Sequence, residues 1–180
     1  MGKSLIEIAK AVIQAEAESV LALKDRINND FEKVCDTLKS CRGKVVLIGM
    51  GKSGHIAKKI SATLASTGTP SFFLHPGEAG HGDLGMVTED DVVIMISYSG
   101  EADEIISLLP GIRRINVPII SLSGNSKSYI AKSSDFNLDV SVDKEACPNN
   151  LAPTSSTTAA LVMGDAIAVS LINANNFTPE

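Results

Sequence analysis

The sequence predicts an α/β fold in which helices cover both faces of a parallel β-sheet. Short apolar runs alternate along the chain with segments of helical spacing. Apolar strands with helices between them are typical of parallel sheets that are buried on both faces. The chain has 180 residues, of which 44% are hydrophobic, so it is long enough to bury a sizeable core.

Two helices are expected before the sheet. Apolar residues recur at helical spacing over residues 5–27, with acidic residues between them, which predicts a long amphipathic helix. Residues 28–30 interrupt this pattern, and Asp30 is expected to cap a second helix that extends to residue 38. We expect one domain, with N-terminal helices in residues 1–42 and the α/β core in residues 43–180.

The core is expected to alternate strands and helices. The strands are predicted at residues 45–48, 71–74, 92–96, 117–122 and 136–140, and the helices at 56–65, 101–109, 126–132 and 159–173. The fifth strand is the weakest in apolar character, so it is expected at an edge of the sheet. The last helix is apolar almost all round and is expected to be central and buried.

Composition excludes several classes of protein. The net charge is −5 without a concentrated basic region, so nucleic acid is not an expected partner. The three cysteines lack metal or redox spacing, which is typical of reduced thiols in a cytoplasmic protein. Acidic residues in the N-terminal apolar pattern argue against a signal peptide. The longest apolar stretch, residues 159–172, is too short and too polar to span a membrane.

The glycine-rich segment at residues 49–54, Gly-Met-Gly-Lys-Ser-Gly, is the most informative part of the chain. It follows an apolar strand and opens a helical segment. A turn of this kind binds phosphate because free backbone N–H groups and the helix dipole both face the anion. We therefore expect a phosphate-bearing ligand, with Gly51 among its contacts.

Two nucleotide-binding motifs fit this segment poorly. A Walker A loop needs a glycine at the position of Val46, which lies inside the strand. A dinucleotide fingerprint matches the three glycines, but it also needs an acid at the end of the second strand. The nearest acid is Glu78, beyond a proline. No nucleotide cofactor is expected.

A second loop favours a sugar phosphate instead. Ser97, Ser99 and Gly100 also follow a strand and precede a helix. Two hydroxyl groups and a glycine at a helix N-terminus can hold a phosphate monoester, although serines also cap helices without binding anything. Because the carboxyl ends of neighbouring parallel strands share one crevice, both loops are expected to face the same ligand.

Several side chains near these loops could carry chemistry. Lys52 could stabilise negative charge on a sugar oxygen. Glu101 and Glu104 share roughly one helix face, so one could serve the helix dipole while the other acts as a general base. His81 lies in a polar loop after the second strand and could carry protons. The histidines form no pattern with acids or cysteines, so no metal is expected.

A run of hydroxyl residues precedes the last helix. Thr154 and Ser155 belong to this run, which is expected to cap the helix and, if it faces the crevice, to bind sugar hydroxyls. Asp165 is the lone acid in the apolar part of that helix, and it is expected to be structural and hydrogen-bonded to a loop, because burying an unpaired carboxylate is costly.

Taken together, these segments resemble the sugar isomerase (SIS) domain family and, within it, the arabinose 5-phosphate isomerases. The resemblance runs from about residue 43 to the C-terminus, and the order and spacing of the motifs make it specific. The segments that carry it are residues 49–55, 65–70, 75–79, 81–86, 96–101, 152–158 and 163–165.

The resemblance implies a three-layer αβα sandwich with a five-stranded parallel sheet of Rossmann-like topology, assembled as a homotetramer. It implies a cofactor-free aldose–ketose isomerase that interconverts D-ribulose 5-phosphate and D-arabinose 5-phosphate through an enediol, supplying the Kdo sugar of lipopolysaccharide. Matched by position, Lys52, His81 and Glu104 fall on residues implicated in catalysis. Ser53, Ser97 and Ser99 fall on the phosphate-binding serines of SIS domains.

Two departures from the family pattern are expected to matter. Some relatives carry a threonine phosphate donor where this chain has Ala102. The family also continues into a segment ending in His-Pro-Gly-Gly, whose histidine is implied to complete an active site across a subunit boundary, and many members append paired CBS domains. This sequence ends at Glu180. Two alternatives remain open: another phosphosugar isomerase, and a non-catalytic phosphosugar-binding or regulatory module.

Overall fold

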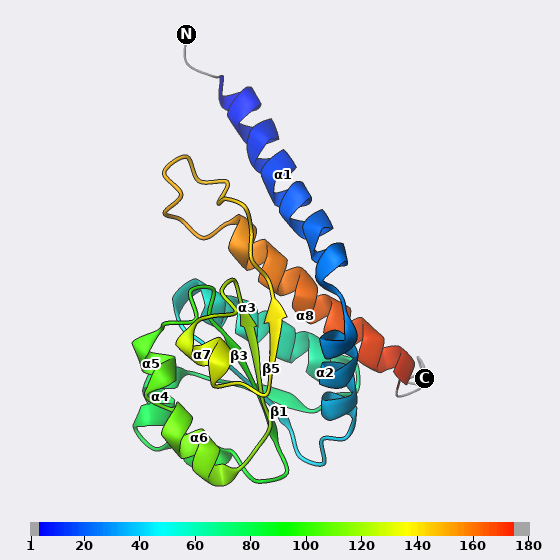
Figure 1. The fold of residues 1–180 in the computed structure, drawn as a ribbon, viewed down its shortest axis with the longest axis vertical. Helices are drawn as coiled ribbons and strands as arrows, with labels where there is room; N and C mark the ends of the chain where they lie inside the picture. The colour runs from blue at the N-terminus through cyan, green and yellow to red at the C-terminus, as the bar shows by residue number, and fades with distance from the viewer. Residues whose placement is uncertain (1–3, 175–180) are drawn as a thin grey trace.

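The computed structural model describes residues 4–174 and contains a sheet of five parallel strands (Figure 1). The strands are β1 (Val45–Gly49), β2 (Ser71–Leu74), β3 (Val92–Ile96), β4 (Ile119–Ser123) and β5 (Phe136–Asp139). Their order in the sheet is β2-β1-β3-β4-β5, and every neighbouring pair is parallel. The first strand, β1, therefore lies inside the sheet, and the strand order reverses direction between β1 and β3. Open α/β sheets bind their ligands at such a point.

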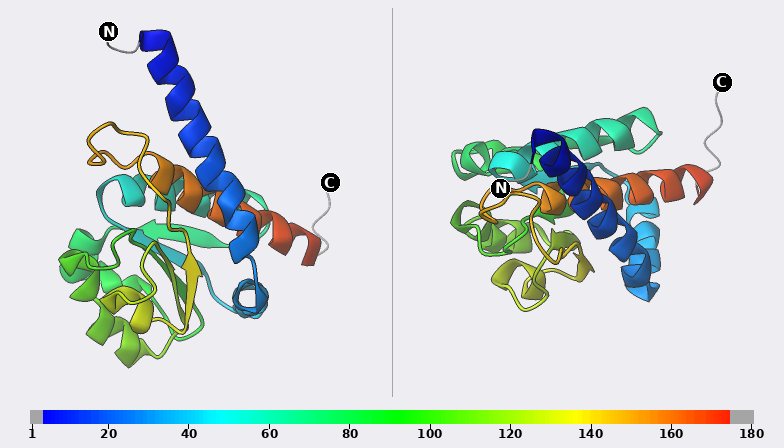
Figure 2. Two further views of the ribbon diagram at one scale, coloured as in Figure 1. Left: turned by 45° about the horizontal axis from the view of Figure 1, so that its top comes forward. Right: turned by 90° about the horizontal axis from the view of Figure 1, so that it is seen from above.

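Helices cover both faces of this sheet, as Figure 2 shows from two further directions. The helices are α1 (Leu5–Ala22), α2 (Asn29–Lys39), α3 (Gly51–Ser66), α4 (Pro76–Gly80), α5 (Asp103–Ile106), α6 (Leu109–Ile115), α7 (Tyr129–Lys132) and α8 (Ser155–Ala174). Short 3₁₀ turns lie at Leu23–Arg26 and Asp83–Met86. The α/β class, the parallel sheet and the N-terminal helices predicted from the sequence are confirmed.

The two faces of the sheet have separate apolar cores. On one face, Leu47 and Ile94 pack with buried side chains of α2, α3 and α8. On the other face, Val46 and Met95 pack with buried side chains of α4, α5, α6 and α7. Successive strand residues point to opposite faces, so a strand buried on both sides must be apolar throughout. This explains why β1 and β3 are continuous apolar runs.

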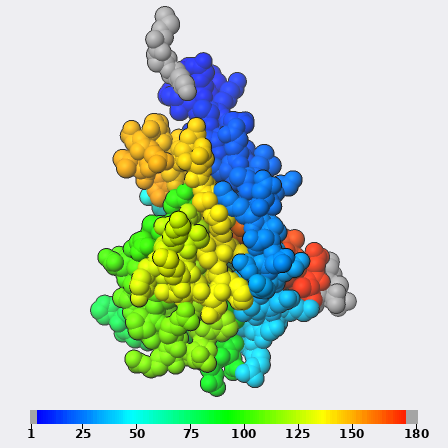
Figure 3. Space-filling view, viewed as in Figure 1, coloured from blue at the N-terminus to red at the C-terminus, as the bar shows by residue number. Residues whose placement is uncertain are grey.

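Helix α1 extends away from this core. It packs against α8 near its C-terminal end, and its N-terminal turns project beyond the body of the molecule (Figures 1 and 3). Ser4 caps it, accepting a hydrogen bond from the Glu7 N–H at 3.2 Å, while the Glu7 carboxylate accepts one from the Ser4 N–H. Large apolar side chains of this helix are exposed, including Leu5 and Ile13, at 85% and 70%.

Several element boundaries differ from the sequence predictions. Helix α3 begins at Gly51 rather than at residue 56, because the glycine-rich segment forms its first turn. Residues 101–109, predicted as one helix, are divided between α5 and α6. Helix α4 was not predicted, because its proline and glycines are typical of a loop. The β2 strand was predicted at its observed boundaries, and β5 lies at the sheet edge as expected.

Two predicted roles of single residues were wrong. The N-cap of α2 is Asn28, whose side chain accepts a hydrogen bond from the Asp30 N–H at 2.9 Å, so Asp30 lies inside the helix. Asp165 on α8 forms an ion pair with Lys59 on α3 rather than a hydrogen bond to a loop. The Asp30 carboxylate instead pairs with Lys33 one helical turn on, at 3.0 Å, whereas the partner of Asp165 lies on a different helix.

Helix α8 is longer and less buried than predicted. It begins at Ser155, and Val169 on its outer side is 56% exposed, so it is not buried all round. Among the described residues it is the one helix long and apolar enough to cross a membrane. Half of its most apolar stretch is buried inside the protein, and a core helix of a soluble fold meets the same criterion. It contacts α1, α2 and α3.

Candidate functional site

The loops singled out in the sequence lie at the same edge of the sheet. The glycine-rich turn follows β1, the segment containing His81 follows β2, and the serine loop follows β3. Because these strands are parallel neighbours, their carboxyl ends bring all three segments to one side of the molecule. The fold thus gathers candidates from separate parts of the sequence into one region.

The N-terminus of α3 is suited to an anion. Gly51 starts the helix with a left-handed φ of +56°, and the first turn contains no acidic residue. Lys52 is exposed, and Ser53 is half-buried. The free N–H groups of this turn, the helix dipole and the lysine all favour negative charge. This end of α3 is therefore the most anion-receptive part of the site.

The serine loop has hydroxyl hydrogens available for a ligand. Ser97 Oγ accepts a hydrogen bond from the Gly100 N–H at 3.2 Å, and Ser99 Oγ accepts one from the Glu101 N–H at 3.2 Å. Each oxygen is used as an acceptor, which leaves its hydroxyl hydrogen to donate elsewhere. Gly100 has a φ of +68°, and a Cβ there would overlap the Ser128 side chain, so glycine is required. The loop can therefore donate two hydrogen bonds to a phosphate.

The two glutamates after this loop have different surroundings. Glu101 Oε1 accepts a hydrogen bond from the Tyr129 N–H at 2.9 Å and so caps α7. Glu104 lies in the first turn of α5 and is exposed, and its carboxylate has no hydrogen-bond or ion-pair partner among residues 4–174. Ala102 is the N-cap of α5 and offers no side-chain donor. The Glu101 carboxylate is therefore used to cap α7, whereas the Glu104 carboxylate is available to accept a proton from a ligand.

His81 lies at the C-terminal end of α4, and α4 packs against α5. His81 is exposed, and its N–H donates to the Glu78 carbonyl at 2.9 Å. Because α4 contacts α5, His81 at the end of α4 lies on a helix beside the one that carries Glu104. Lys52 follows β1, the strand between β2 and β3. All three residues are exposed at the rim of the site.

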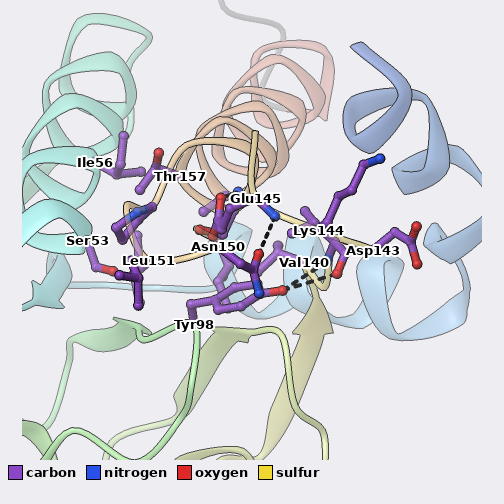
Figure 4. Close-up of a pocket in the computed structure, with 16 residues that line it drawn as sticks. Ser53, Ile56, Tyr98, Val140, Asp143, Lys144, Glu145, Asn150, Leu151 and Thr157 are labelled. Atoms are coloured by element: carbon purple, nitrogen blue, oxygen red, sulfur yellow. Dashed lines mark hydrogen bonds between the residues drawn. The ribbon is translucent and has the colours of Figure 1, made fainter. Parts of the chain in front are cut away.

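A cavity of about 260 Å³ opens beside this rim. Figure 4 shows Ser53 on one side of the cavity and Lys144 on the other, with Tyr98 below them. The walls come from the start of α3, the ends of β3 and β4, the segment after β5 and the start of α8. Its lining residues are Ser53, Ile56, Ile96, Tyr98, Leu122, Val140, Val142, Asp143, Lys144, Glu145, Asn150, Leu151, Pro153, Ser156, Thr157 and Ala160.

Tyr98 holds the segment after β5 against the sheet. Its hydroxyl donates to the Val142 carbonyl at 3.3 Å and accepts from the Val142 N–H at 3.1 Å. These paired bonds fix one wall of the cavity. Tyr98 stands between the two candidate serines, so a single loop both offers phosphate donors and shapes the cavity next to them.

Glu145 is a site residue that sequence reasoning missed. Its Oε2 accepts hydrogen bonds from the Thr154 N–H at 2.8 Å, the Thr154 hydroxyl at 3.1 Å and the Ser156 N–H at 3.2 Å. The carboxylate therefore occupies the N-terminus of α8. Burial raises the pKa of Glu145, but hydrogen bonds from Ser156 and Thr154 outweigh it, so the pKa lies below its ordinary value. The Glu145 carboxylate thus lines the cavity in its charged form.

The two predicted hydroxyl residues at the start of α8, Thr154 and Ser155, differ from Ser53 in that neither lines the cavity. The Thr154 hydroxyl is already hydrogen-bonded within the protein: it donates to Glu145 and accepts from the Ala146 N–H at 2.9 Å. Ser155 is fully buried and has no hydrogen-bond partner. Neither residue lines the cavity described above, whereas Ser156 and Thr157 do. Their expected contact with sugar hydroxyls stays a prediction.

Glu145→Gln is expected to destabilise the protein at pH 7 by about 1 kcal/mol, since it removes a charged cap from a helix N-terminus. This is roughly 3 °C in Tm for a chain of this size. Because the folded pKa is lowered, the contribution is present above the ordinary value of 4.5 and is lost as pH falls through the folded value. The gap between the two proteins should therefore close in acid.

Thermal unfolding at several pH values measures this gap. Glu89→Gln is a matched control, because Glu89 is exposed at the amino edge of the sheet and makes no hydrogen bond or ion pair among the described residues. Its Tm should match that of the unchanged protein at each pH. A Glu145→Gln deficit that stays constant from pH 7 to pH 3.5 would contradict the assigned role of the carboxylate.

No group of three or more His, Cys, Asp or Glu side chains within residues 4–174 could hold a metal ion. The three cysteines are free thiols. The groups available at this edge of the sheet are hydroxyl and N–H donors, the lysines Lys52 and Lys144, His81, and the carboxylates of Glu104, Asp143 and Glu145. Such a set can bind a phosphate and move protons on an attached sugar.

Comparison with known proteins shows the family of this chain. The SIS domain family model matches residues 37–170. The chain is 56% identical to arabinose 5-phosphate isomerase KdsD of Pseudomonas aeruginosa over 97% of its own length and 54% of that protein. It is also 56% identical to KdsD of Escherichia coli strain K12, over 97% of its length and 53% of that protein. The chain thus spans about half the length of these curated relatives.

A solved structure agrees over nearly the whole chain. The structure of E. coli CFT073 c3406 in complex with arabinose 5-phosphate superposes with a TM-score of 0.94 at 46% identity, covering 99% of this chain and 95% of that one. The shared sheet, the two phosphate-suited loops and the family match lead to the same assignment. The chain therefore belongs to the SIS domain family.

Proposed function

We propose that this SIS domain is an aldose–ketose isomerase that interconverts D-ribulose 5-phosphate and D-arabinose 5-phosphate, supplying Kdo for lipopolysaccharide synthesis. The observation that carries the proposal is the 56% identity to KdsD arabinose 5-phosphate isomerases over 97% of the chain. The likeness to a protein solved with arabinose 5-phosphate supports it. We also propose that residues 1–180 form one domain, with helices in 1–42 and the αβα core in 43–180.

The phosphate is placed between the glycine-rich turn and the serine loop. Ser53, Ser97 and Ser99 donate hydroxyl hydrogens to its oxygens, and backbone N–H groups around Gly51 and Gly100 complete the cradle. This placement is supported by the acid-free first turn of α3 and by the two serine oxygens that already accept backbone N–H groups. The sugar then extends from the cradle toward the cavity and its rim.

Isomerisation follows from the three rim residues. Glu104 removes the proton from C2 of the aldose and returns it to C1, so that the carbonyl moves from C1 to C2 through a cis-enediol. Lys52 stabilises the negative charge that develops on the enediolate oxygen. His81 transfers the proton between the oxygens on C1 and C2, and it assists ring opening. No cofactor is needed, because the net reaction only relocates hydrogen within the sugar.

The proposal extends to the assembly and location of the protein. We infer a homotetramer in the cytoplasm, without membrane or nucleic-acid partners. Exposed apolar side chains on α1, with Ile13 at 70% exposure, support association through this helix. Sedimentation equilibrium would measure the mass directly, and a monomer at micromolar concentration would refute the tetramer.

A coupled assay with D-arabinose 5-phosphate tests the activity. We expect ribulose 5-phosphate to form, with other pentose, hexose and heptose phosphates turned over more slowly. The same assay should be run on this chain and on a chain extended through a His-Pro-Gly-Gly segment. Thermal shift with the same sugars measures binding separately. A rise in Tm with the sugar phosphate but no turnover, in both chains, would favour a binding module. Equal turnover of another sugar phosphate would mean that D-arabinose 5-phosphate is not the preferred substrate.

A further inference from the structure

Tyr98 connects the loops that follow three neighbouring strands. It lies in the serine loop after β3, between Ser97 and Ser99. Its carbonyl accepts a hydrogen bond from the Gly124 N–H at 2.9 Å, directly after β4. Its hydroxyl is bonded to the N–H and the carbonyl of Val142, in the segment after β5, at 3.1 and 3.3 Å. One residue of the phosphate loop therefore reaches the far side of the cavity.

Gly124 leaves room for the tyrosine ring. A Cβ at this position would lie 2.5 Å from Cε2 of the Tyr98 ring and 2.9 Å from its Cδ2 and Cζ. The φ of Gly124 lies outside the left-handed region, so its backbone conformation alone does not require glycine. The ring is therefore seated against Gly124, while its hydroxyl end is bonded to Val142.

The segment after β5 depends on Tyr98 where it lines the cavity. Val142, Asp143 and Lys144 all contribute to the cavity wall. Within residues 4–174, the main-chain groups of Asp143 and Lys144 make no hydrogen bond. Just before them, Arg26 bonds the Ser141 carbonyl from the side of α1. On the side of the serine loop, the wall is thus held by the two bonds of the tyrosine hydroxyl.

The Tyr98 hydroxyl is not available to move a proton on a ligand. It carries one hydrogen, which it donates to the Val142 carbonyl, and it also accepts from the Val142 N–H. The residue lines the cavity, but its only polar side-chain atom is used within the protein. Any effect of this hydroxyl on a ligand must therefore act through the position of the wall.

The two sides of the cavity are held differently. Figure 4 shows Ser53 on one side and Lys144 on the other, with Tyr98 below them. The Ser53 side belongs to α3, which packs along β1, β2 and α8 and is fixed by these contacts. The Lys144 side is an irregular segment. The width of this cavity of about 260 Å³ therefore depends on how firmly Tyr98 holds that segment.

We propose that Tyr98 is a positioning residue that sets the length of the sugar chain accepted, by holding the wall of residues 142–144 at a fixed distance from the serine loop. This inference rests on the proposed function, since it assumes a sugar phosphate whose phosphate lies at that loop. With the phosphate held there, a fixed wall accepts a chain of five carbons, and a sixth carbon with its hydroxyl meets the wall.

Tyr98→Phe tests the inference with two sugar alcohol phosphates that cannot be isomerised, D-arabinitol 5-phosphate and D-glucitol 6-phosphate. They share the three stereocentres next to the phosphate-bearing carbon and differ by one carbon with its hydroxyl. The measured quantity is the dissociation constant of the longer compound divided by that of the shorter one. A closed pocket discriminates against one extra carbon by roughly tenfold or more, so we expect a ratio of about ten in the unchanged protein.

In Tyr98→Phe this ratio should fall to about three or less, because the variant keeps the ring on Gly124 but releases Val142. The dissociation constant of inorganic phosphate should not change, since Ser97 and Ser99 remain in place. A purely structural role of the hydroxyl would lower Tm and weaken both sugar alcohol phosphates in equal proportion, which leaves the ratio as it was.

Tyr129→Phe is the matched control. It removes the hydroxyl of the second tyrosine, which is 56% exposed and whose hydroxyl makes no hydrogen bond among the described residues. Its ratio should equal that of the unchanged protein. Gly124→Ala approaches the same contact from the other end, because the added Cβ displaces the Tyr98 ring, and it should also lower the ratio.

The inference is overturned if Tyr98→Phe or Gly124→Ala keeps the ratio of the unchanged protein, or if that protein binds the two sugar alcohol phosphates equally. It is also overturned if Tyr98→Phe loses affinity for inorganic phosphate by the same factor as for D-arabinitol 5-phosphate. These outcomes leave the proposed isomerase intact. If the unchanged protein neither binds D-arabinitol 5-phosphate nor converts D-arabinose 5-phosphate, the proposed function is refuted, and the inference with it.

Discussion

Glu104→Gln is expected to reduce the rate of isomerisation roughly 10²–10⁴-fold while D-arabinose 5-phosphate still binds. Gln keeps the size and polarity of the side chain but cannot accept the proton from C2. The position leaves the carboxylate free for this role, because Glu104 is exposed in the first turn of α5 without a partner among the described residues. The effect should appear in kcat, with KM almost unchanged.

The neighbouring acids make the experiment specific. Asp103→Asn removes a charge from the same turn of α5 and should leave kcat within a factor of about two, because a first-turn acid acts mainly on the helix dipole. Glu101→Gln should lower Tm rather than kcat, since Glu101 caps α7 through the Tyr129 N–H. Steady-state kinetics measures kcat for the three variants, and thermal unfolding measures their Tm. Normal kcat in Glu104→Gln would remove this residue as the base.

The glycine-rich turn after β1 and the serine loop after β3 could be located from the sequence, because the pattern that identifies each of them is local. An apolar run, a glycine or serine turn and a helical segment follow one another directly, and parallel topology then places their ends together. The sequence also indicated that one of Glu101 and Glu104 serves a helix. It did not indicate that the helix is α7, which begins 28 residues after Glu101 at Tyr129.

Glu145 and Ser156 could not be predicted because their relationship is not local. The carboxylate bonds residues that lie nine and eleven positions further along the chain, beyond an irregular loop. No periodic pattern relates a loop acid to a helix N-terminus at that separation. The same limit applies to Thr158 and Glu16, which are 142 residues apart in sequence yet bonded at 2.9 Å. Such pairs depend on the packing of α1, α8 and the connecting loop.

Gly54→Ala is expected to destabilise the fold by about 2 kcal/mol, roughly 5 °C in Tm. A Cβ at Gly54 would lie 2.7 Å from the Gly49 carbonyl oxygen, closer than normal contact. That oxygen belongs to β1, which is held between β2 and β3 and cannot easily move. Alanine gains about 1 kcal/mol over glycine in helix propensity, but the steric cost against fixed backbone should exceed it.

This prediction separates the two roles of the glycine-rich segment. Gly80→Ala is the control, because a Cβ there meets nothing within 4 Å, and it should leave Tm unchanged or slightly higher. If Gly54→Ala were equally harmless, the close approach of α3 to β1 would not constrain the segment. Since α3 carries Lys52 and Ser53 in its first turn, displacing it from β1 should also weaken binding of inorganic phosphate. The first and last glycines of the motif thus act on the site by fixing where the helix begins, and not by touching the ligand.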